Sequence, residues 1–148
     1  MPQKINSSKF SIYLAGFLDG DGSIYVRAKP NSSYKYGYQV APTVAFFQSK
    51  KNKKFPELCK CIGFGTMRIR KDNIFEYTIA KQEEIKNFLE QVLPHLVLKQ
   101  EQAILMLKIL DLKEKVQNKD DFNSLLALID SFRDLNYSKN RKVRTLTP

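Results

Sequence analysis

The chain has 148 residues, 43% of them hydrophobic, and its 25 lysines and arginines outnumber its 15 acidic residues. This size and apolar content suffice for one domain with a sizeable core. The formal net charge of +10 and the isoelectric point near 9.6 indicate a polyanionic partner. No segment is long and apolar enough to span a membrane and residues 1–10 do not form a secretory signal, so we expect neither membrane insertion nor secretion.

The chain lacks the side chains on which several classes of enzyme depend. His95 is the single histidine, which excludes a Ser-His-Asp or Cys-His mechanism and a histidine-rich metal site. Cys59 and Cys61 are two positions apart, a spacing that suits neither a usual zinc half-site nor an unstrained disulfide. We therefore expect reduced, partly buried thiols, and any catalysis must use carboxylates, lysines and water.

The first predicted element is a helix that begins near Ser7 or Ser8 and ends near residue 22. One stripe of this helix is apolar and contains Phe10, Leu14 and Phe17. Another face is nearly bare and consists of Ile12, Gly16, Asp19 and Gly20. Each helical glycine costs roughly 1 kcal/mol relative to alanine, so a bare face indicates that another backbone comes close. Asp19 and Asp21 lie at the negative end of the helix dipole, where we expect a positive group to compensate them.

Residues 14–22, LAGFLDGDG, have two interpretations. They fit an ordinary amphipathic helix that ends in a turn, since aspartate and glycine are common turn residues. Alternatively, two copies of the helix pack through their glycine faces and bring two Asp21 carboxylates together to hold divalent cations over a phosphodiester. Hard oxygen ligands of this kind suit magnesium.

Residues 22–48 alternate between apolar and polar side chains, which predicts two strands joined by a tyrosine-rich hairpin tip. The expected inward residues are Ile24, Val26, Ala28, Val40, Val44 and Phe46. The expected outward residues of the second strand are Gln39, Ala41, Thr43 and Ala45. Pro42 cannot donate a hydrogen bond to a neighbouring strand, so it predicts an edge position or a bulge.

The rest of the chain continues the pattern of hairpin and helix. A basic connection leads to a short helix at residues 55–62, and a second hairpin runs from residue 67 to residue 79. A helix is predicted at residues 81–93 and a second at 101–115, whose apolar residues from Ile104 to Leu110 should be largely buried. Asp120 or Asp121 opens a last helix that ends near Asn136.

The segment LAGFLDGDG resembles the LAGLIDADG signature of homing endonucleases and departs from it at Phe17, Leu18 and Gly20. The predicted order, α-β-β-α-β-β-α-α-α, is also similar to that of a single-motif protomer of this family, over nearly the whole chain. The resemblance implies an α+β fold whose saddle-shaped sheet, mixed or antiparallel, carries helices on one face. We expect one domain at residues 1–138 and a basic tail at 139–148 that is mobile or contacts DNA.

The resemblance implies that each protomer contributes Asp21 and the main-chain carbonyl of Gly20 to metal ions at a dimer axis. Mg²⁺ is the implied cofactor, and Mn²⁺ or Ca²⁺ can substitute for it in binding. The implied dimer interface contains Ile12, Gly16, Asp19 and Gly20, with Asp19 helping to cap the facing helices. Because one chain carries one motif, the active enzyme is expected to be a homodimer.

Two further polar residues match positions that surround the metals in this family. Gln48 and Lys99 would order water and neutralise the scissile phosphate, although a glutamine at a strand end or a lysine after an apolar loop is usually only solvent-facing. The family also has a basic residue a few positions beyond Gln48, where this chain has Asn52. Of the lysines at 51, 53 and 54, Lys53 is the predicted substitute.

The resemblance also implies a long, partly palindromic site on double-stranded DNA that is cut with a stagger. The expected contacts on the strands and the hairpin tip are Tyr25, Arg27, Lys29, Asn31, Ser33, Tyr34, Gln39, Thr43, Arg68, Arg70, Glu76 and Thr78. Arginine favours guanine, glutamine adenine and glutamate cytosine, and each good contact discriminates by roughly 1 to 3 kcal/mol. No small-molecule substrate is expected.

Two alternatives to the endonuclease remain open. The same fold can serve as a catalytically silent binding module, either an intron maturase that holds RNA or a DNA-binding regulator. A generic basic RNA-associated protein with an accidental motif is the second alternative. Proteins that resemble this one are commonly encoded in introns, so a chloroplast or mitochondrial location is implied, with the cytoplasm as the other possibility.

Overall fold

The structure, a computed structural model, describes residues 7–136 and contains all the predicted helices and strands in the predicted order. The elements are α1 (Ser8–Asp21), β1 (Gly22–Pro30), β2 (Tyr38–Ser49), α2 (Phe55–Ile62), β3 (Thr66–Ile69), β4 (Ile74–Ile79), α3 (Gln82–Val92), α4 (Gln100–Lys115) and α5 (Lys119–Leu135). A short 3₁₀ helix, η1 (Leu93–His95), follows α3 at the point where Pro94 interrupts the α-helical pattern. The predicted basic tail lies outside the described residues.

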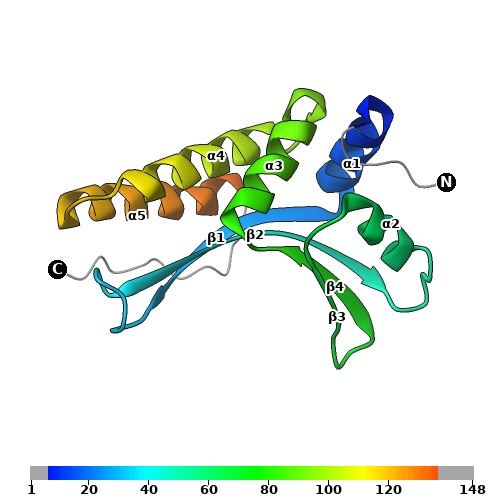
Figure 1. Cartoon of the computed structure of the whole chain (residues 1–148), viewed down its shortest axis with the longest axis horizontal. Helices are drawn as coiled ribbons and strands as arrows, with labels where there is room; N and C mark the ends of the chain where they lie inside the picture. The colour runs from blue at the N-terminus through cyan, green and yellow to red at the C-terminus, as the bar shows by residue number, and fades with distance from the viewer. Residues whose placement is uncertain (1–6, 137–148) are drawn as a thin grey trace.

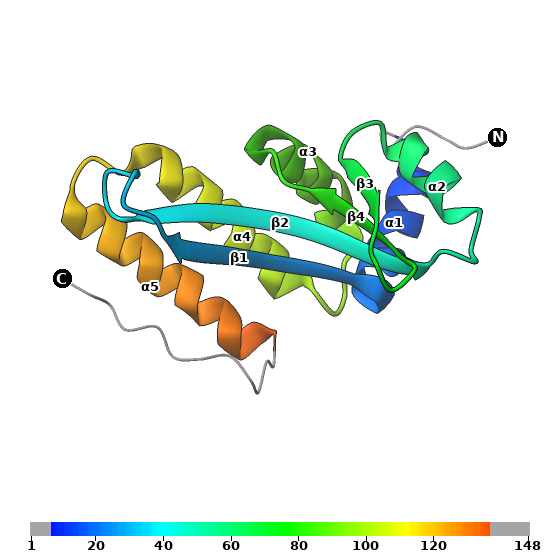
Figure 2. The ribbon, with the colours of Figure 1, turned by 90° about the horizontal axis from the view of Figure 1, so that it is seen from below.

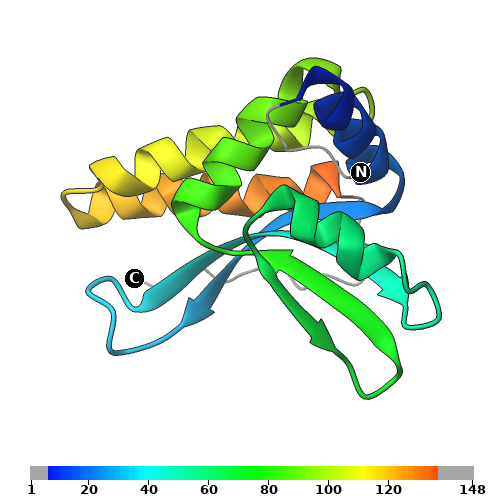
Figure 3. The same ribbon diagram turned by 45° about the vertical axis from the view of Figure 1, so that its right-hand side comes forward.

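The four strands form one antiparallel sheet in the order β1-β2-β4-β3. The helices lie on one face of this sheet, and the other face is curved and carries no helix of the described part of the chain (Figures 1 and 3). Seen from below, the long β1–β2 pair crosses the molecule with the β3–β4 hairpin beside one end of it (Figure 2). The predicted α+β class and the placement of the helices are confirmed, and the sheet is antiparallel rather than mixed.

The core fills the space between the sheet and the helices. Ile24, Val26 and Ala28 point inward from β1, as the alternation predicts, and Phe46 of β2 is completely buried. Phe17 of α1 stacks on Phe46 with ring centroids 4.8 Å apart, which joins the first helix to the centre of the sheet. The helix that carries the bare glycine face is therefore held by aromatic packing on its opposite side.

One prediction about β2 was wrong. Val40 packs against the core as predicted, and it is only half-buried because it lies toward the hairpin tip, beyond the strand β4. Ala45 was expected to face solvent but is fully buried. It pairs with Ser23 on one side and Thr78 on the other, and in the middle of the sheet a single methyl group is covered by its neighbours.

Pro42 occupies the edge position that its missing N–H predicts. The pairing between β2 and β4 begins at Val44, opposite Ile79, so β4 does not reach Pro42. Only β1 lies beside this residue, through its pairing with Val26. The long strand β2 is thus central at one end and an edge strand at the other.

The C-terminal helices depart from the predictions in two details. Ile104 is 52% exposed although Met106, Ile109 and Leu110 of the same helix are buried, because the packing of α4 on α5, β1 and α3 leaves this residue uncovered. The cap of α5 is Asn118, not an aspartate: its side chain accepts from the backbone N–H of Asp121 at 2.8 Å. The side chain of Asp121 in turn accepts from the N–H of Gln117, the residue before the cap, at 3.1 Å.

The cysteines are free thiols, as their spacing predicts. Cys59 of α2 is buried, and this burial, together with the neighbouring Cys61, raises the pKa of its thiol to about 12. No helix within residues 7–136 is long and apolar enough to cross a membrane.

Candidate active site at the end of helix α1

The end of α1 is fixed by a direct junction between helix and strand. Asp21 is the last residue of the helix, and Gly22 begins β1 without an intervening loop. A Cβ atom on Gly22 would lie 2.5 Å from Leu18 Cδ1 and 2.9 Å from Phe46 Cε1, so only glycine allows this close packing. The junction places the exposed carboxylate of Asp21 at the edge of the sheet.

Gln48, near the end of β2, is the side chain that contacts this carboxylate. Its Nε2 donates to Asp21 Oδ2 at 2.7 Å, although 27 residues separate the two positions. Asn52 Nδ2 approaches the other side of the same amide, 3.5 Å from Gln48 Oε1. The Oδ1 of Asn52 accepts from the backbone N–H of Lys54 at 3.3 Å, which leaves the Asn52 amino group directed toward Gln48.

Lys99 approaches the same helix end from the loop before α4. Its Nζ donates to the main-chain oxygen of Asp19 at 2.8 Å, one of the carbonyls that the end of a helix leaves without an intrahelical partner. The Asp19 carboxylate accepts from the backbone N–H groups of Val97 and Lys99, at 2.8 and 2.9 Å. Asp19 thus contacts the Lys99 loop of its own chain.

The charged groups at this helix end have neutral partners. The expected positive group is present at this helix end as the Lys99 ammonium, which bonds to the Asp19 carbonyl, whereas N–H donors contact the two carboxylates themselves. The ion pairs within residues 7–136 are Arg68–Glu76, Arg70–Asp72 and Lys115–Asp111. Neither Asp21 nor Lys99 takes part in them, so both charges remain available to an external ligand.

The bare face of α1 has no neighbour among residues 7–136. A Cβ atom built on Gly16 or Gly20 would find no atom of its surroundings within 4 Å. Ile12 is 53% exposed on the same face, and the nearby loop exposes Val97 and Leu98. An apolar, glycine-bearing helix face that is open in one copy is suited to close packing against a second backbone.

The open face of the sheet carries the outward rows that the alternation predicts. Arg27 and Lys29 are exposed, and the Arg27 guanidinium lies 5.1 Å from the centroid of the Tyr25 ring. Gln39, Thr43 and Thr78 are half-buried members of the same rows. At the hairpin tip Tyr34 is exposed, and Asn31 Oδ1 accepts from Ser33 N and Ser33 Oγ at 3.0 and 2.6 Å.

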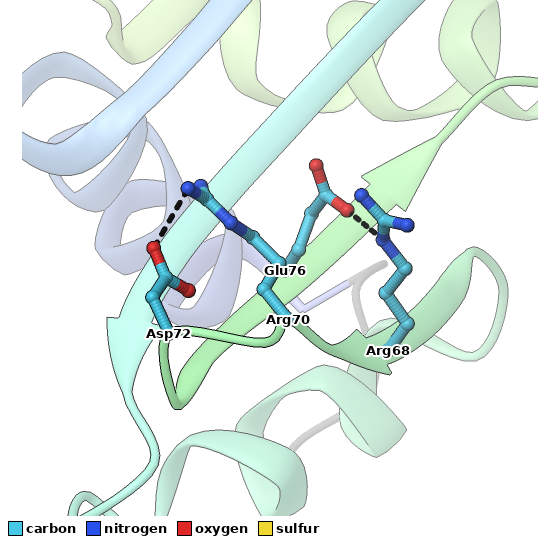
Figure 4. A network of polar contacts seen from close by, with 4 residues as sticks. All are labelled: Arg68, Arg70, Asp72 and Glu76. Atoms are coloured by element: carbon cyan, nitrogen blue, oxygen red, sulfur yellow. Dashed lines mark hydrogen bonds and ion pairs between the residues drawn. The ribbon is translucent and has the colours of Figure 1, made fainter.

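The arginines of the second hairpin are paired with carboxylates (Figure 4). Arg68 of β3 contacts Glu76 of β4 across the ladder. Arg70, just beyond β3, bonds to Asp72 of the turn at 2.9 Å, and its guanidinium lies 5.8 Å from the centroid of the Phe47 ring. Phe47 and Asp72 were not predicted as site residues. For Asp72 the sequence does hold a signal, because a carboxylate two positions after an arginine in a tight turn indicates an ion pair.

The basic position beyond Gln48 is occupied by Asn52, whose amide reaches the site. Lys53, like its lysine neighbours at 50, 51 and 54, is exposed on the loop after β2. The contact between Asn52 and Gln48 was missed in the sequence, where only their separation of four residues hints at it. The predicted role of Lys53 therefore rests on its charge and its position in the loop.

One copy offers a hard cation few ligands. No group of three His, Cys, Asp or Glu side chains within residues 7–136 is close enough to hold a metal ion. The donors at the helix end are the exposed Asp21 carboxylate and the Gly20 carbonyl, which belongs to the last helical turn. Both are oxygen donors at the negative end of a helix dipole, which fits Mg²⁺ or Ca²⁺ when further oxygens come from water, phosphate or a second copy.

An exposed carboxylate and a lysine beside an open helix face, next to a strand surface rich in arginine, belong to a class of enzyme that hydrolyses phosphodiesters. The family profile described as LAGLIDADG endonuclease matches residues 14–109 of the chain. The chain belongs to this family and is an endonuclease.

Two curated relatives are similar over most of their length. DNA endonuclease I-CreI of Chlamydomonas reinhardtii is 38% identical over 143 residues, which cover 95% of this chain and 87% of the relative. DNA endonuclease I-CvuI of Chlorella vulgaris is 34% identical over 115 residues, which cover 77% of this chain and 70% of the relative.

Solved structures agree with the fold. I-CvuI in complex with its target in the presence of 2 mM Ca has a TM-score of 0.85 at 29% identity, covering 92% of this chain and 87% of that one. I-CvuI in complex with the I-CreI target in the presence of 2 mM Mg, with the DNA not cleaved, has a TM-score of 0.84 at 30% identity, covering 90% and 85%. Both structures are complexes with DNA in the presence of a divalent cation.

Proposed function

We propose that this chain is a homing endonuclease that makes a staggered double-strand break in a long, partly palindromic DNA site. The single observation that carries the proposal is the meeting of Asp21, Gln48 and Lys99 at the end of α1, beside the open glycine face. Family membership supports the chemistry, and the net charge of +10 supports a nucleic-acid substrate. As in the family at large, we propose an intron-encoded, organellar origin.

The functional unit is a homodimer in which two α1 helices pack through Ile12, Gly16 and Gly20. Glycines four residues apart lie on one side of a helix and allow two backbones to approach closely. Packing of this kind brings the two Asp21 residues near one twofold axis, where one copy alone has too few ligands. A twofold axis also accounts for a partly palindromic site.

The metal site consists of Asp21 and the Gly20 carbonyl of both copies. When bound there, Mg²⁺ supplies a water of lowered pKa and neutralises charge on the phosphate. Gln48 holds Asp21 Oδ2 by its amide, so the other carboxylate oxygen would be the one to hold the cation. Asn52 orients that amide in turn. We therefore propose Asn52, rather than Lys53, as the residue beyond Gln48 that supports the active site.

Lys99 supplies positive charge to the scissile phosphate. Its ammonium has no carboxylate within ion-pair distance among the described residues, so it need not leave a salt bridge to meet the DNA. A preorganised cation at the position where negative charge develops lowers the barrier without reorganisation during the reaction. Mg²⁺ and Lys99 would thus both neutralise negative charge on the scissile phosphate.

The open sheet face reads the DNA sequence. Its outward rows contain arginine, glutamine, threonine and glutamate, the side chains that hydrogen-bond base edges in a major groove. The exposed lysines of the loop after β2 add contacts to phosphate, which are independent of sequence and sensitive to salt.

A cleavage selection tests the proposal. The protein is incubated with Mg²⁺ and a large library of randomised duplexes, the cut ends are sequenced, and the selection is repeated with Asp21→Asn. Staggered cuts in one long, partly palindromic sequence that disappear with Asp21→Asn are expected. Tight binding without cutting in either Mg²⁺ or Mn²⁺ would instead favour a catalytically silent binding module.

A further inference from the structure

The loop at residues 96–99 carries Lys99 and has little packing of its own. Leu96 is buried, but Val97 and Leu98 are 80% and 71% exposed. The apolar contacts of this loop therefore end at Leu96, three residues before Lys99, whose position has to be accurate. Something other than packing has to fix the backbone between Leu96 and the start of α4.

The carboxylate of Asp19 supplies that restraint. Its Oδ2 accepts from Val97 N–H at 2.8 Å and its Oδ1 from Lys99 N–H at 2.9 Å, so one carboxylate holds the backbone on both sides of Leu98. Hydrogen bonds to a charged acceptor are roughly twice as strong as neutral ones. The two bonds span 78 and 80 positions of sequence and join the end of α1 to the loop before α4.

The same aspartate also fixes the far end of the lysine side chain. Lys99 Nζ donates to the main-chain oxygen of Asp19 at 2.8 Å. Lys99 is thus held at its backbone N–H by the Asp19 side chain and at its ammonium by the Asp19 carbonyl. The four-carbon stem between these contacts would otherwise be free to adopt many rotamers.

We propose that Asp19 is a positioning residue, which orders the 96–99 loop within its own chain and thereby sets the place of the Lys99 ammonium. This inference rests on the proposed function of Lys99 and departs from an interface role for the Asp19 carboxylate. Asp19 does not touch the phosphate or the metal. It acts on the cleavage rate through Lys99.

The test compares Asp19→Asn with Asp111→Asn. Both substitutions remove one negative charge, but Asp111 lies on the surface of α4 and pairs only with Lys115. An asparagine at position 19 keeps one acceptor oxygen and turns an amino group toward the second N–H, so one of the two loop bonds is lost. Hydrogen exchange is measured by NMR at the amides of Val97 and Lys99 in the full-length protein without metal or DNA.

In Asp19→Asn we expect exchange at these two amides to be faster by about tenfold or more, with no change at the amides of α1. The single-turnover cleavage rate in Mg²⁺ should fall by about 10- to 100-fold while the affinity for DNA in Ca²⁺ and the dimeric state stay unchanged. In a Lys99→Met background, Asp19→Asn should have little further effect on the rate. Asp111→Asn should match the wild type in every measurement.

Unchanged exchange at both amides would overturn the proposal. A monomeric Asp19→Asn in sedimentation velocity would also contradict it and assign the carboxylate to the dimer interface. If Asp19→Asn lowers the cleavage rate by the same factor in the Lys99→Met background as in the wild type, Asp19 acts independently of the lysine. If the wild type itself fails to cleave, the proposed function fails, whereas the exchange experiment still decides whether Asp19 orders the loop.

Discussion

The end of α1 and the β3–β4 hairpin both present charged side chains, but they stabilise these charges in opposite ways. At the end of α1, amide and backbone N–H groups contact Asp19 and Asp21, and a carbonyl contacts Lys99. On the hairpin, Arg68 and Arg70 are paired with carboxylates of the same chain. One region keeps its charges unneutralised and the other neutralises them before any ligand arrives.

The difference follows from what each region must do. A site that binds a cation and a scissile phosphate gains from charges that are ordered but uncompensated, because no internal partner has to be displaced. On a surface that reads bases, each arginine has to give up its carboxylate partner in order to contact a base. A correct base compensates for the lost ion pair and an incorrect base does not, so the ion pair within the protein disfavours binding to incorrect sequences. Under the proposed function, catalysis and specificity would therefore be separated in the molecule by the kind of partner that each charge has.

The largest predicted effect concerns the unneutralised charge. Lys99→Met should lower the single-turnover cleavage rate by about 10²- to 10³-fold, because it removes a preorganised cation from the scissile phosphate. Affinity for the selected DNA in Ca²⁺ should change by less than about tenfold, since one phosphate contact is lost among many. Quenched-flow cleavage and fluorescence anisotropy measure the two quantities. A large loss of affinity with an unchanged rate would show that Lys99 only binds DNA.

On the hairpin, Arg68→Ala should cost about 1 to 3 kcal/mol of affinity for the preferred site and relax the sequence requirement at one base pair. Glu76→Gln should have a different result, in which Arg68 is released from its pair and binding to incorrect sites tightens more than binding to the correct one. Competition binding against single-base variants of the selected site measures both. Equal changes for all sequences would mean that Arg68 contacts phosphate rather than a base.

A smaller effect is expected at Asn52. A carboxylate in Asn52→Asp cannot donate to Gln48 Oε1, so the Gln48 amide loses the contact that orients it toward Asp21. The Mg²⁺ concentration for half-maximal cleavage should rise by about tenfold. The side-chain amide signals of Gln48 in an NMR spectrum should shift in the metal-free protein. Signals and metal dependence that match those of the wild type would rule out an orienting role for the amide.

The smallest effect is expected at the exposed turn pair. Arg70 and Asp72 have side-chain exposures of 41% and 52%, and such pairs are worth about 0 to 1 kcal/mol. Asp72→Asn should therefore tighten DNA binding by less than about fivefold, and the gain should shrink as salt is raised. Anisotropy titrations at several salt concentrations measure this, with Asp111→Asn as the control of equal charge. A change in DNA affinity of more than tenfold would contradict the view that Asp72 only competes with DNA for Arg70.

The sequence predicted the elements of this fold well because hydrophobic periodicity records which side faces the core. It predicted the inward row Ile24, Val26 and Ala28 and the edge position of Pro42 for this reason. It failed where exposure depends on neighbours from other elements. Ala45 is covered by adjacent strands, and Ile104 is exposed although its helix packs on α5, β1 and α3.

The candidate site was predictable in its parts and not in its connections. The resemblance identified Asp21, Gln48 and Lys99, and the structure brings all three to one helix end. The contact of Asp19 with the Lys99 loop spans 80 positions, and no local pattern records it. The contact of Asn52 with Gln48 was missed because an uncharged amide in a loop rich in lysine carries no signal of its own in the sequence.

Mixed dimers give the most direct test of an active site formed by two copies, each with its own Lys99. Wild-type and Lys99→Met chains with different affinity tags are co-expressed, purified through both tags and incubated in Mg²⁺ with a supercoiled plasmid that carries the selected site. Accumulation of nicked circles is expected, because only one of the two phosphates then has its lysine. Linear product at the wild-type rate, or a complete absence of cutting by the mixed dimer, would contradict a site in which each copy serves its own strand.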